Sequence, residues 1–446
     1  MRQQYAILAL LLLAACGDAV GPRPRPGAPP QDTSNGSGLA PALSWYATEP
    51  RVIVLGSTDS VVLTAQLKGS GSARVHTSAG ERFTLRAAGG LHQVVLPVSS
   101  LLFDYRPGDE HHLGAQLDID GQVNRVDLVF NVRDGSQPDA AVRGIAPGVQ
   151  ATDHVINIRL DSTSIGPTVP ASIIREVYRH FPDHYDFIAV LEAVRSTRYR
   201  TYQGVRNGIT GIGLATFDQA SQYGSAGALQ GVIQYPSDDT FDLAETGNIH
   251  EIGHRWINFT RVGMLATGSP HWPLSSLAFG VMGLTDGTRG PGSAFPYRIM
   301  PAGDRYQLQA VARARDFNEL ELYLMGLFSP EQVPPFFVFR NQRLVSQVFN
   351  GALLPGPLDT VRVDDVIAME GARHPAAANA QRTFRMATVV LSRGRLLSRS
   401  ELSFFDHMAA RGEAETELPY RQGGIRGQTR PFFLATGQRA RLVTRL

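Results

Sequence analysis

Short runs of alternating apolar and polar residues follow one another from residue 42 to about residue 134. Glycine-rich breaks such as Gly69-Ser70-Gly71 and Gly89-Gly90 separate them. A period of two is typical of strands that bury one face, and this spacing of strands is typical of a β-sandwich. The pattern predicts an immunoglobulin-like β-sandwich over 42–134. Its predicted strands lie at 52–55, 60–65, 83–85, 92–96, 112–117 and 125–130.

Beyond a linker near residues 134–139, helical and strand periods alternate as far as the carboxyl end. Apolar residues recur at helical spacing over 171–180, whereas 187–191, 211–216 and 228–235 have the character of strands. Further on, the pattern predicts a strand over 384–391, an amphipathic helix over 400–408 and an edge strand over 440–446. These elements predict an α+β domain over 138–446, with its carboxy-terminal stretch forming a separate lower lobe.

A further helix is predicted from about Glu245 to about Phe259, because no proline interrupts this stretch and apolar residues recur along one face. Within it, His250-Glu251-Ile252-Gly253-His254 has the pattern H-E-x-x-H. On a helix the two histidines lie one turn apart on one face, so both imidazoles can bind one zinc ion. Glu251 then points toward a bound water. The motif predicts a hydrolytic zinc site.

Catalytic zinc sites usually have three protein ligands, so the motif leaves one ligand to be found. The metzincin pattern would continue with glycine and histidine at the positions of Ile257 and Thr260, which excludes it. Two candidates remain downstream. His271 lies in a turn-rich segment, and Glu321 lies on a predicted second helix over 318–327.

The amino-terminal sixteen residues have the pattern of an export signal. Arg2 precedes an apolar run over 6–13, and Leu13-Ala14-Ala15-Cys16 closes the segment. This tetrapeptide resembles the bacterial lipobox, in which the cysteine is acylated. We therefore expect residues 1–16 to be a lipoprotein signal peptide and Cys16 to anchor the protein in the bacterial cell envelope. In enteric bacteria, an aspartate directly after the cysteine tends to hold a lipoprotein in the inner membrane. Gly17 occupies this position, which favours anchoring in the outer membrane or at the cell surface.

Composition narrows these predictions. Residues 17–41 are rich in proline and glycine and predict a disordered tether. Cys16 is the only cysteine, so a thiolate metal site is excluded and the zinc ligands must be histidine, carboxylate and water. The formal net charge of +2 argues against a nucleic-acid partner.

Three blocks of the sequence resemble zincin metallopeptidases, and more narrowly a set of exported bacterial proteins. They are His250-Glu251-Ile252-Gly253-His254-Arg255-Trp256, His271-Trp272 and Leu322-Tyr323-Leu324-Met325-Gly326-Leu327. The resemblance implies a zincin-like domain that hydrolyses peptide bonds of peptide or protein substrates through a zinc-bound water, with Glu251 as general base. It favours His271 over Glu321, because the position of Glu321 is often aspartate in those proteins.

The resemblance also suggests supporting roles for residues around the site. Tyr323, Tyr235 and Arg255 are candidate donors to the oxyanion, and Met282 is a candidate apolar floor beneath the metal. The strand over 228–235 would form the exposed edge that pairs with substrate. We expect His111, His112, His374 and His407 not to bind metal. Two alternatives stay open: a surface binding or adhesion lipoprotein with an inactive zincin fold, and a zinc amidase acting on the cell wall.

Overall fold

The structure is a computed structural model of the chain. It describes residues 13–15, 42–77, 79–101, 115–121, 125–128, 130–135, 138–161, 168–196, 201–236, 247–266, 271–283, 297–311, 316–418, 421–422, 425–426 and 430–446. Cys16, the predicted tether and the pair His111 and His112 lie outside these residues. None of the helices in this described part combines the length and apolar character needed to span a membrane.

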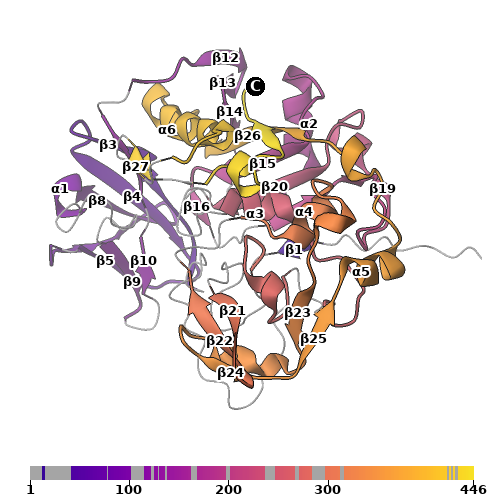
Figure 1. The fold of residues 1–446 in the computed structure, drawn as a ribbon. Helices are drawn as coiled ribbons and strands as arrows, with labels where there is room; N and C mark the ends of the chain where they lie inside the picture. The colour runs from indigo at the N-terminus through magenta and orange to yellow at the C-terminus, as the bar shows by residue number, and fades with distance from the viewer. Residues whose placement is uncertain are drawn as a thin grey trace, which may run out of the picture.

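A nine-stranded mixed sheet forms the centre of the molecule (Figure 1). Its four middle strands, β20, β15, β26 and β14, run parallel, and antiparallel strands flank them on both sides. The order is β1 (Leu13–Ala15), β17 (Thr201–Gly204), β20 (Gly231–Pro236), β15 (Phe187–Glu192), β26 (Thr383–Arg393), β14 (Val155–Leu160), β13 (Val149–Ala151) and β12 (Arg143–Ala146), with β29 (Arg441–Val443) beside β26.

Both faces of this sheet are covered, as the unbroken burial of β15 shows. Phe187 and Leu191 point into the core shared with the motif helix, whereas Ile188 and Val190 point into the core beneath α2 (Ala171–His180). Parallel strands covered on both faces are typically continuous apolar runs, which is how 187–191 reads. The helix predicted over 171–180 and the strand over 187–191 are confirmed.

The strand predicted over 211–216 is wrong. Gly211 and Gly213 have positive φ values of 77° and 82°, and their backbone lies against that of other loops. A Cβ at Gly213 would lie 2.2 Å from the carbonyl oxygen of Phe259. The two glycines therefore allow a loop to approach the end of the motif segment closely, which apolar alternation alone does not reveal.

Two predictions about the sheet also need correction. The strand within 228–235 is β20, which lies between β17 and β15 and is not an exposed edge. The strand predicted over 384–391 is β26, which lies in the middle of the sheet between β15 and β14. The carboxy-terminal stretch therefore completes the central sheet and does not form a separate lower lobe. Chain order does not fix strand order when a late strand inserts between early ones.

The first part of the chain folds into two antiparallel sheets whose side chains share one core. Three of the predicted strands, at 52–55, 60–65 and 92–96, are confirmed in this part of the chain. The predictions over 83–85, 112–117 and 125–130 overlap strands at 82–84, 115–119 and 126–127, while the strands over 43–49 and 73–77 were not predicted. One sheet has the order β16 (Arg195–Ser196), β2 (Leu43–Glu49), β4 (Ser60–Leu67), β8 (Leu91–Pro97) and β7 (Arg86–Ala88); the other has β10 (Val126–Asp127), β9 (Ala115–Ile119), β5 (Ala73–Thr77) and β6 (Arg82–Thr84).

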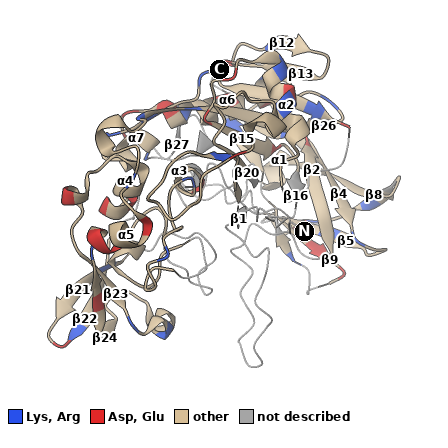
Figure 2. Cartoon of the chain, turned by 90° about the vertical axis from the view of Figure 1, so that its right-hand side faces the viewer, with Lys and Arg blue, Asp and Glu red and all other residues tan. Residues whose placement is uncertain are grey.

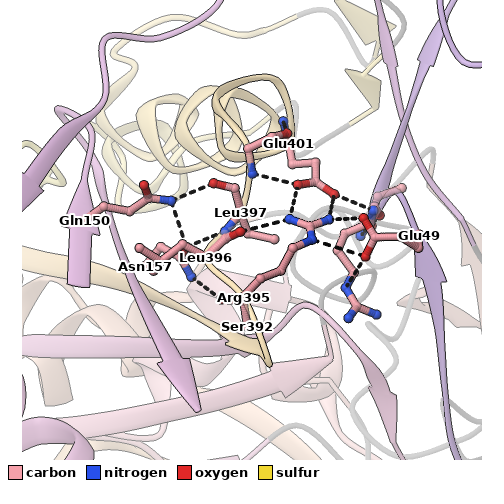
Figure 3. A network of polar contacts seen from close by, with 11 residues as sticks. Glu49, Gln150, Asn157, Ser392, Arg395, Leu396, Leu397 and Glu401 are labelled. Atoms are coloured by element: carbon pink, nitrogen blue, oxygen red, sulfur yellow. Dashed lines mark hydrogen bonds and ion pairs between the residues drawn. The ribbon is translucent and has the colours of Figure 1, made fainter. Parts of the chain in front are cut away.

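These two sheets are joined to the α/β part by both backbone and side-chain contacts. β16 belongs to the later part of the chain but pairs with β2, and β11 (Asn131–Asp134) pairs in parallel with β3 (Val52–Leu55) beside α6 (Arg399–Ala410). A polar network around Arg395 joins Glu49 at the end of β2 to Glu401 of α6 (Figure 3). The helix predicted over 400–408 is confirmed as α6.

Smaller elements complete the fold, and Figure 1 shows β21 to β25 at the end of the molecule away from α2 and α6. They are α1 (Val98–Leu101), β18 (Arg206–Asn207), β19 (Phe217–Asp218), β21 (Tyr297–Ala302), β22 (Arg305–Ala310), α4 (Glu319–Met325), β23 (Phe336–Phe339), β24 (Leu353–Pro355), β25 (Leu358–Val361), α5 (Val363–Glu370), β27 (Arg421–Gln422), β28 (Ile425–Arg426) and α7 (Phe432–Ala435). The class is mixed α/β, compatible with the α+β prediction.

Candidate metal centre

His250 and Glu251 of the H-E-x-x-H motif lie on α3 (Gly247–Gly253), which packs on the central sheet, and His254 follows the helix directly. Ile249 and Ile252 are fully buried in the core that also holds Phe187 of β15. Trp256, just after the helix, meets Phe187 edge to face with ring centroids 6.2 Å apart. Figure 2 shows α3 between β20 on one side and α4 on the other. Apolar residues at helical spacing therefore fix the position of the motif against the sheet.

The helix ends earlier than the sequence predicts. After Gly253 the chain continues in turns, in which the N–H of Ile257 donates to the carbonyl of Gly253 over 3.2 Å. Asn258 then adopts a left-handed conformation with φ of 73°, which ends the helical path before Phe259. The N–H of His254 still donates to the carbonyl of His250 at 3.3 Å, so the one-turn relation of the two histidines is retained.

Three buried imidazoles converge at this point. His254 Nε2 and His271 Nε2 each lie 3.2 Å from His250 Nε2. Among the described residues, His250, His254 and His271 form the group of His, Cys, Asp or Glu side chains placed to hold a metal ion, and all three are buried. The structure thus brings His271, from a separate loop, to the two motif histidines.

The spacing of these nitrogens is compatible with a shared metal ion. With Zn–N bonds of about 2.0–2.1 Å, tetrahedral angles place two ligand nitrogens about 3.3 Å apart, close to the 3.2 Å that separates His250 Nε2 from each of the other two Nε2 atoms. The three ligand atoms all lie within 4.8 Å of one another. His250 Nδ1 donates to the carbonyl of Val281 at 2.7 Å, so in the neutral ring its Nε2 presents a lone pair to the other imidazoles. A cation at this point could be bound by all three imidazole nitrogens.

Met282 lies directly against the motif helix. A Cβ built on Gly253 would lie 2.5 Å from Met282 Sδ and 3.1 Å from Phe317 Cε1. Gly253 therefore leaves the space in which the methionine packs, and Met282 is fully buried. This agrees with close packing at Gly253 and places Met282 beside the helix, while its role as an apolar floor beneath the metal stays a prediction.

Glu321 does not join the histidine group found among the described residues. It is fully buried at the start of α4, where it accepts a hydrogen bond from Trp272 Nε1 at 2.7 Å and one from the N–H of Asn318 at 2.8 Å. Burial raises the pKa of Glu321 to about 8, while those two hydrogen bonds act in the opposite direction. The alternative third ligand therefore contacts the neighbour of His271.

The three candidate oxyanion donors have different surroundings. Arg255 is buried and donates to Gln230 Oε1 at 2.9 Å and to Asn207 Oδ1 at 3.0 Å, so its guanidinium joins α3 to the β18 and β20 side of the fold. Tyr323 Oη accepts from the N–H of Arg373 at 3.3 Å. Tyr235 is the last residue but one of β20, and its side chain lies outside what the structure describes. The oxyanion role of each stays a prediction.

Two further histidines, His374 and His407, lie on other elements of the fold. His374 forms a backbone bridge with Thr210, and His407 lies on α6, where burial lowers its pKa to about 4.

Sequence reasoning missed the hydrogen bond between Trp272 and Glu321 and the one between His250 and the carbonyl of Val281. The adjacent His271-Trp272 pair was a signal for the first, whereas a backbone carbonyl leaves no trace in a sequence.

Comparisons with known proteins add no relative to this geometry: no protein-family model matches the chain, and no curated protein and no solved structure matches it.

Proposed function

We propose that the protein is a zinc-dependent endopeptidase in which His250, His254 and His271 hold the metal. The convergence of three buried imidazole nitrogens carries this proposal. Three histidine ligands with a position left for water or substrate are typical of catalytic zinc, whereas structural sites usually have four protein ligands. The lack of any cysteine besides Cys16 agrees with an all-histidine set.

Glu251 is the proposed general base. It lies between the two motif histidines on α3 and is fully buried, so it shares their rigid support on the sheet. A bound zinc ion supplies Lewis acidity toward a water molecule and toward the carbonyl of the substrate. Glu251 accepts the proton of the attacking water and passes it to the amine that leaves when the peptide bond breaks.

The fold supports this proposal at a coarser level. A mixed sheet with the motif helix packed against it is compatible with a zincin-like domain over 138–446, and two antiparallel sheets with a shared core are compatible with an immunoglobulin-like module over 42–134. We place the protein in the bacterial cell envelope, anchored through Cys16. Replacing Cys16 by serine should abolish labelling by radioactive palmitate. Equal labelling of the wild-type protein and the variant would reject the proposed lipid anchor at Cys16.

Substitution of Glu251 by glutamine tests the catalytic proposal. The full-length variant should keep its metal and lose roughly 10²–10⁴-fold in cleavage of an unfolded protein substrate, because a base is removed and no ligand is. Glu319→Gln, the same change at an exposed glutamate of α4, is the matched control and should cleave normally. Wild-type rates in Glu251→Gln would reject the base.

The same assay separates the alternatives. If metal-loaded wild-type protein leaves the substrate intact, the surface binding protein with an inactive site is favoured. Release of peptides from purified cell wall without cleavage of unfolded protein would favour the amidase.

A further inference from the structure

We propose that Glu321 is a positioning residue that holds the loop 271–283 in the conformation required for metal binding, acting through Trp272. This inference rests on the proposed metal site and deepens it. It assigns a function to a fully buried carboxylate that the proposed mechanism does not use.

The loop 271–283 supplies two parts of the metal site. His271 at its beginning is the third imidazole of the group, and the carbonyl of Val281 near its end accepts the hydrogen bond that orients His250. The N–H of Trp272 donates to the carbonyl of Gly283 at 3.3 Å, which closes the loop. A shift of this loop would therefore displace one proposed ligand and turn another.

The start of α4 holds this loop through three direct hydrogen bonds. Trp272 Nε1 donates to Glu321 Oε1 at 2.7 Å, and Asn318 Nδ2 donates to the carbonyl of Leu277 at 3.0 Å. The N–H of Val281 donates to the carbonyl of Asp316 at 3.2 Å. Of these partners in the described chain, Glu321 is the one whose side chain reaches the residue next to His271.

The contact is close enough to define one loop conformation. Trp272 is fully buried, so its Nε1–H would be left without a partner in an apolar environment if the carboxylate were removed. On the same side, a Cβ at Gly280 would lie 3.0 Å from the carbonyl oxygen of Asp316 and 3.6 Å from Glu321 Oε2. The loop backbone thus packs directly on the first turn of α4.

The carboxyl group of Glu321 has two oxygens that can accept hydrogen bonds, whereas an amide has one. Glu321 accepts from Trp272 through one oxygen and from the N–H of Asn318 through the other. Glutamine has one oxygen, and its NH₂ group would face one of these two donors. Glu321→Gln therefore keeps the volume of the side chain and loses one of the two bonds.

The chain offers a close control. Glu401 is also a buried glutamate at the third position of a helix, and it forms the same capping box, with Ser398, at the start of α6. Its hydrogen bonds run to Arg395, Arg51 and Ser398, not to the loop 271–283. Glu401→Gln therefore perturbs a helix cap and leaves the metal site untouched.

The experiment measures zinc affinity by competition with a chelator, and the visible absorption of the cobalt-substituted protein, in full-length variants. Glu321→Gln and Trp272→Phe should each weaken zinc binding by roughly 10–100-fold and alter the cobalt spectrum, as expected when a ligand's supporting group is removed. Both substitutions remove the same hydrogen bond between Trp272 and Glu321, so their effects should not add. The zinc affinity of the double variant should therefore lie within a few-fold of that of the single variant with the lower affinity. Glu401→Gln should lower the unfolding temperature and leave zinc affinity and the spectrum unchanged.

Unchanged zinc affinity in both Glu321→Gln and Trp272→Phe would overturn this inference while leaving the proposed metal site in place. Equal losses in Glu401→Gln would overturn it as well, because a general loss of stability would then be the cause. A wild-type protein that takes up no metal would overturn the proposed function together with it.

Discussion

At the residue scale, His250 has a close contact at each of its ring nitrogens. Its Nδ1 is fixed by the carbonyl of Val281, and its Nε2 lies 3.2 Å from the Nε2 atoms of both His254 and His271. The residue therefore sets the position at which the two other rings can share a cation. Rotation of this ring would move its Nε2 away from the Nε2 atoms of both His254 and His271.

Replacement of single histidines tests that geometry. His271→Ala should reduce zinc affinity by more than the roughly 10–100-fold cost of losing a supporting residue, because it removes a ligand itself, and the fold should remain intact. Isothermal titration of metal-free protein with zinc measures this. Glu321→Gln should still bind one zinc per chain. If Glu321→Gln binds none and His271→Ala binds normally, Glu321 is the third ligand.

Gly253 provides a second test at this scale. Gly253→Ala places a methyl group against Met282 Sδ and should lower the free energy of unfolding by about 1–3 kcal/mol, as overpacking does in cores. Met282→Ala alone should cost about 2–5 kcal/mol, because it leaves a cavity. In the double variant the new methyl occupies part of that cavity, so urea unfolding should show less loss than the sum of the two. Strict additivity would show that Met282 does not limit the space at Gly253.

At the scale of elements, the first turn of α4 carries a pH dependence. Burial raises the pKa of Glu321 to about 8 from an ordinary value of 4.5. A carboxyl group with a raised folded-state pKa contributes stability fully below the unfolded value, and this contribution is lost as pH rises through the folded value. Metal-free protein should therefore lose stability between about pH 4.5 and 8. In Glu321→Gln this part of the slope should be absent, which urea unfolding at several pH values measures; an unchanged slope would assign it to another group.

The elements that the sequence predicted best have a helical period or an unbroken apolar run. In α2 and α6, over 171–180 and 400–408, apolar side chains at helical spacing reach one core each, whereas 187–191 became β15, whose side chains enter the cores on both faces of the sheet. The segment 211–216 alternates glycine with Ile212 and Leu214 but is a loop, since Gly211 and Gly213 make close backbone contacts with distant parts of the chain. The strand order also needed long-range pairing, because β26 follows β15 by almost two hundred residues yet lies beside it.

In the candidate site, too, some features follow from the local sequence pattern and others depend on long-range contacts. His250, Glu251 and His254 could be read from local spacing on a helix. The need for a third ligand left His271 and Glu321 open, and the resemblance to zincins favoured His271. The closeness of His271 depends on how the loop 271–283 rests on α4, which no local pattern describes.

At the scale of the whole molecule, the two sheets of the first part are fixed to the α/β part. Arg395, after β26, makes two hydrogen bonds of 2.8 and 2.7 Å with Glu401 of α6 and also pairs with Glu49 at the end of β2 (Figure 3). The backbone N–H of Arg51 donates to the same Glu401 at 2.6 Å. Arg393 lies over the ring of Trp45, 4.5 Å from its centroid. These two sheets thus meet the α/β part through charged and aromatic contacts in addition to the β16 and β2 pairing.

Arg395→Ala tests whether this junction stabilises the fold. Burial raises the pKa of Glu401, but hydrogen bonds from Arg395, Ser398 and Arg51 outweigh it, so the net pKa lies below the ordinary value. A lowered carboxyl pKa contributes stability above the unfolded value, and this contribution is lost as pH falls through the folded value. Without Arg395, Glu401 remains buried and loses its cation. Because Arg395 is 38% exposed, we expect a moderate loss of about 1–3 kcal/mol at pH 7.

The loss should be smaller near pH 4, where Glu401 without its arginine takes up a proton, and urea unfolding at both pH values measures the difference. Arg340→Ala is the matched control, because Arg340 is 62% exposed in its pair with Asp359 and should cost no more than about 1 kcal/mol. If the two variants lose equal stability, the Arg395 network behaves as an ordinary surface ion pair. The first part of the chain would then be held to the α/β part by β16 and by the contacts of α6 with β3 and β11.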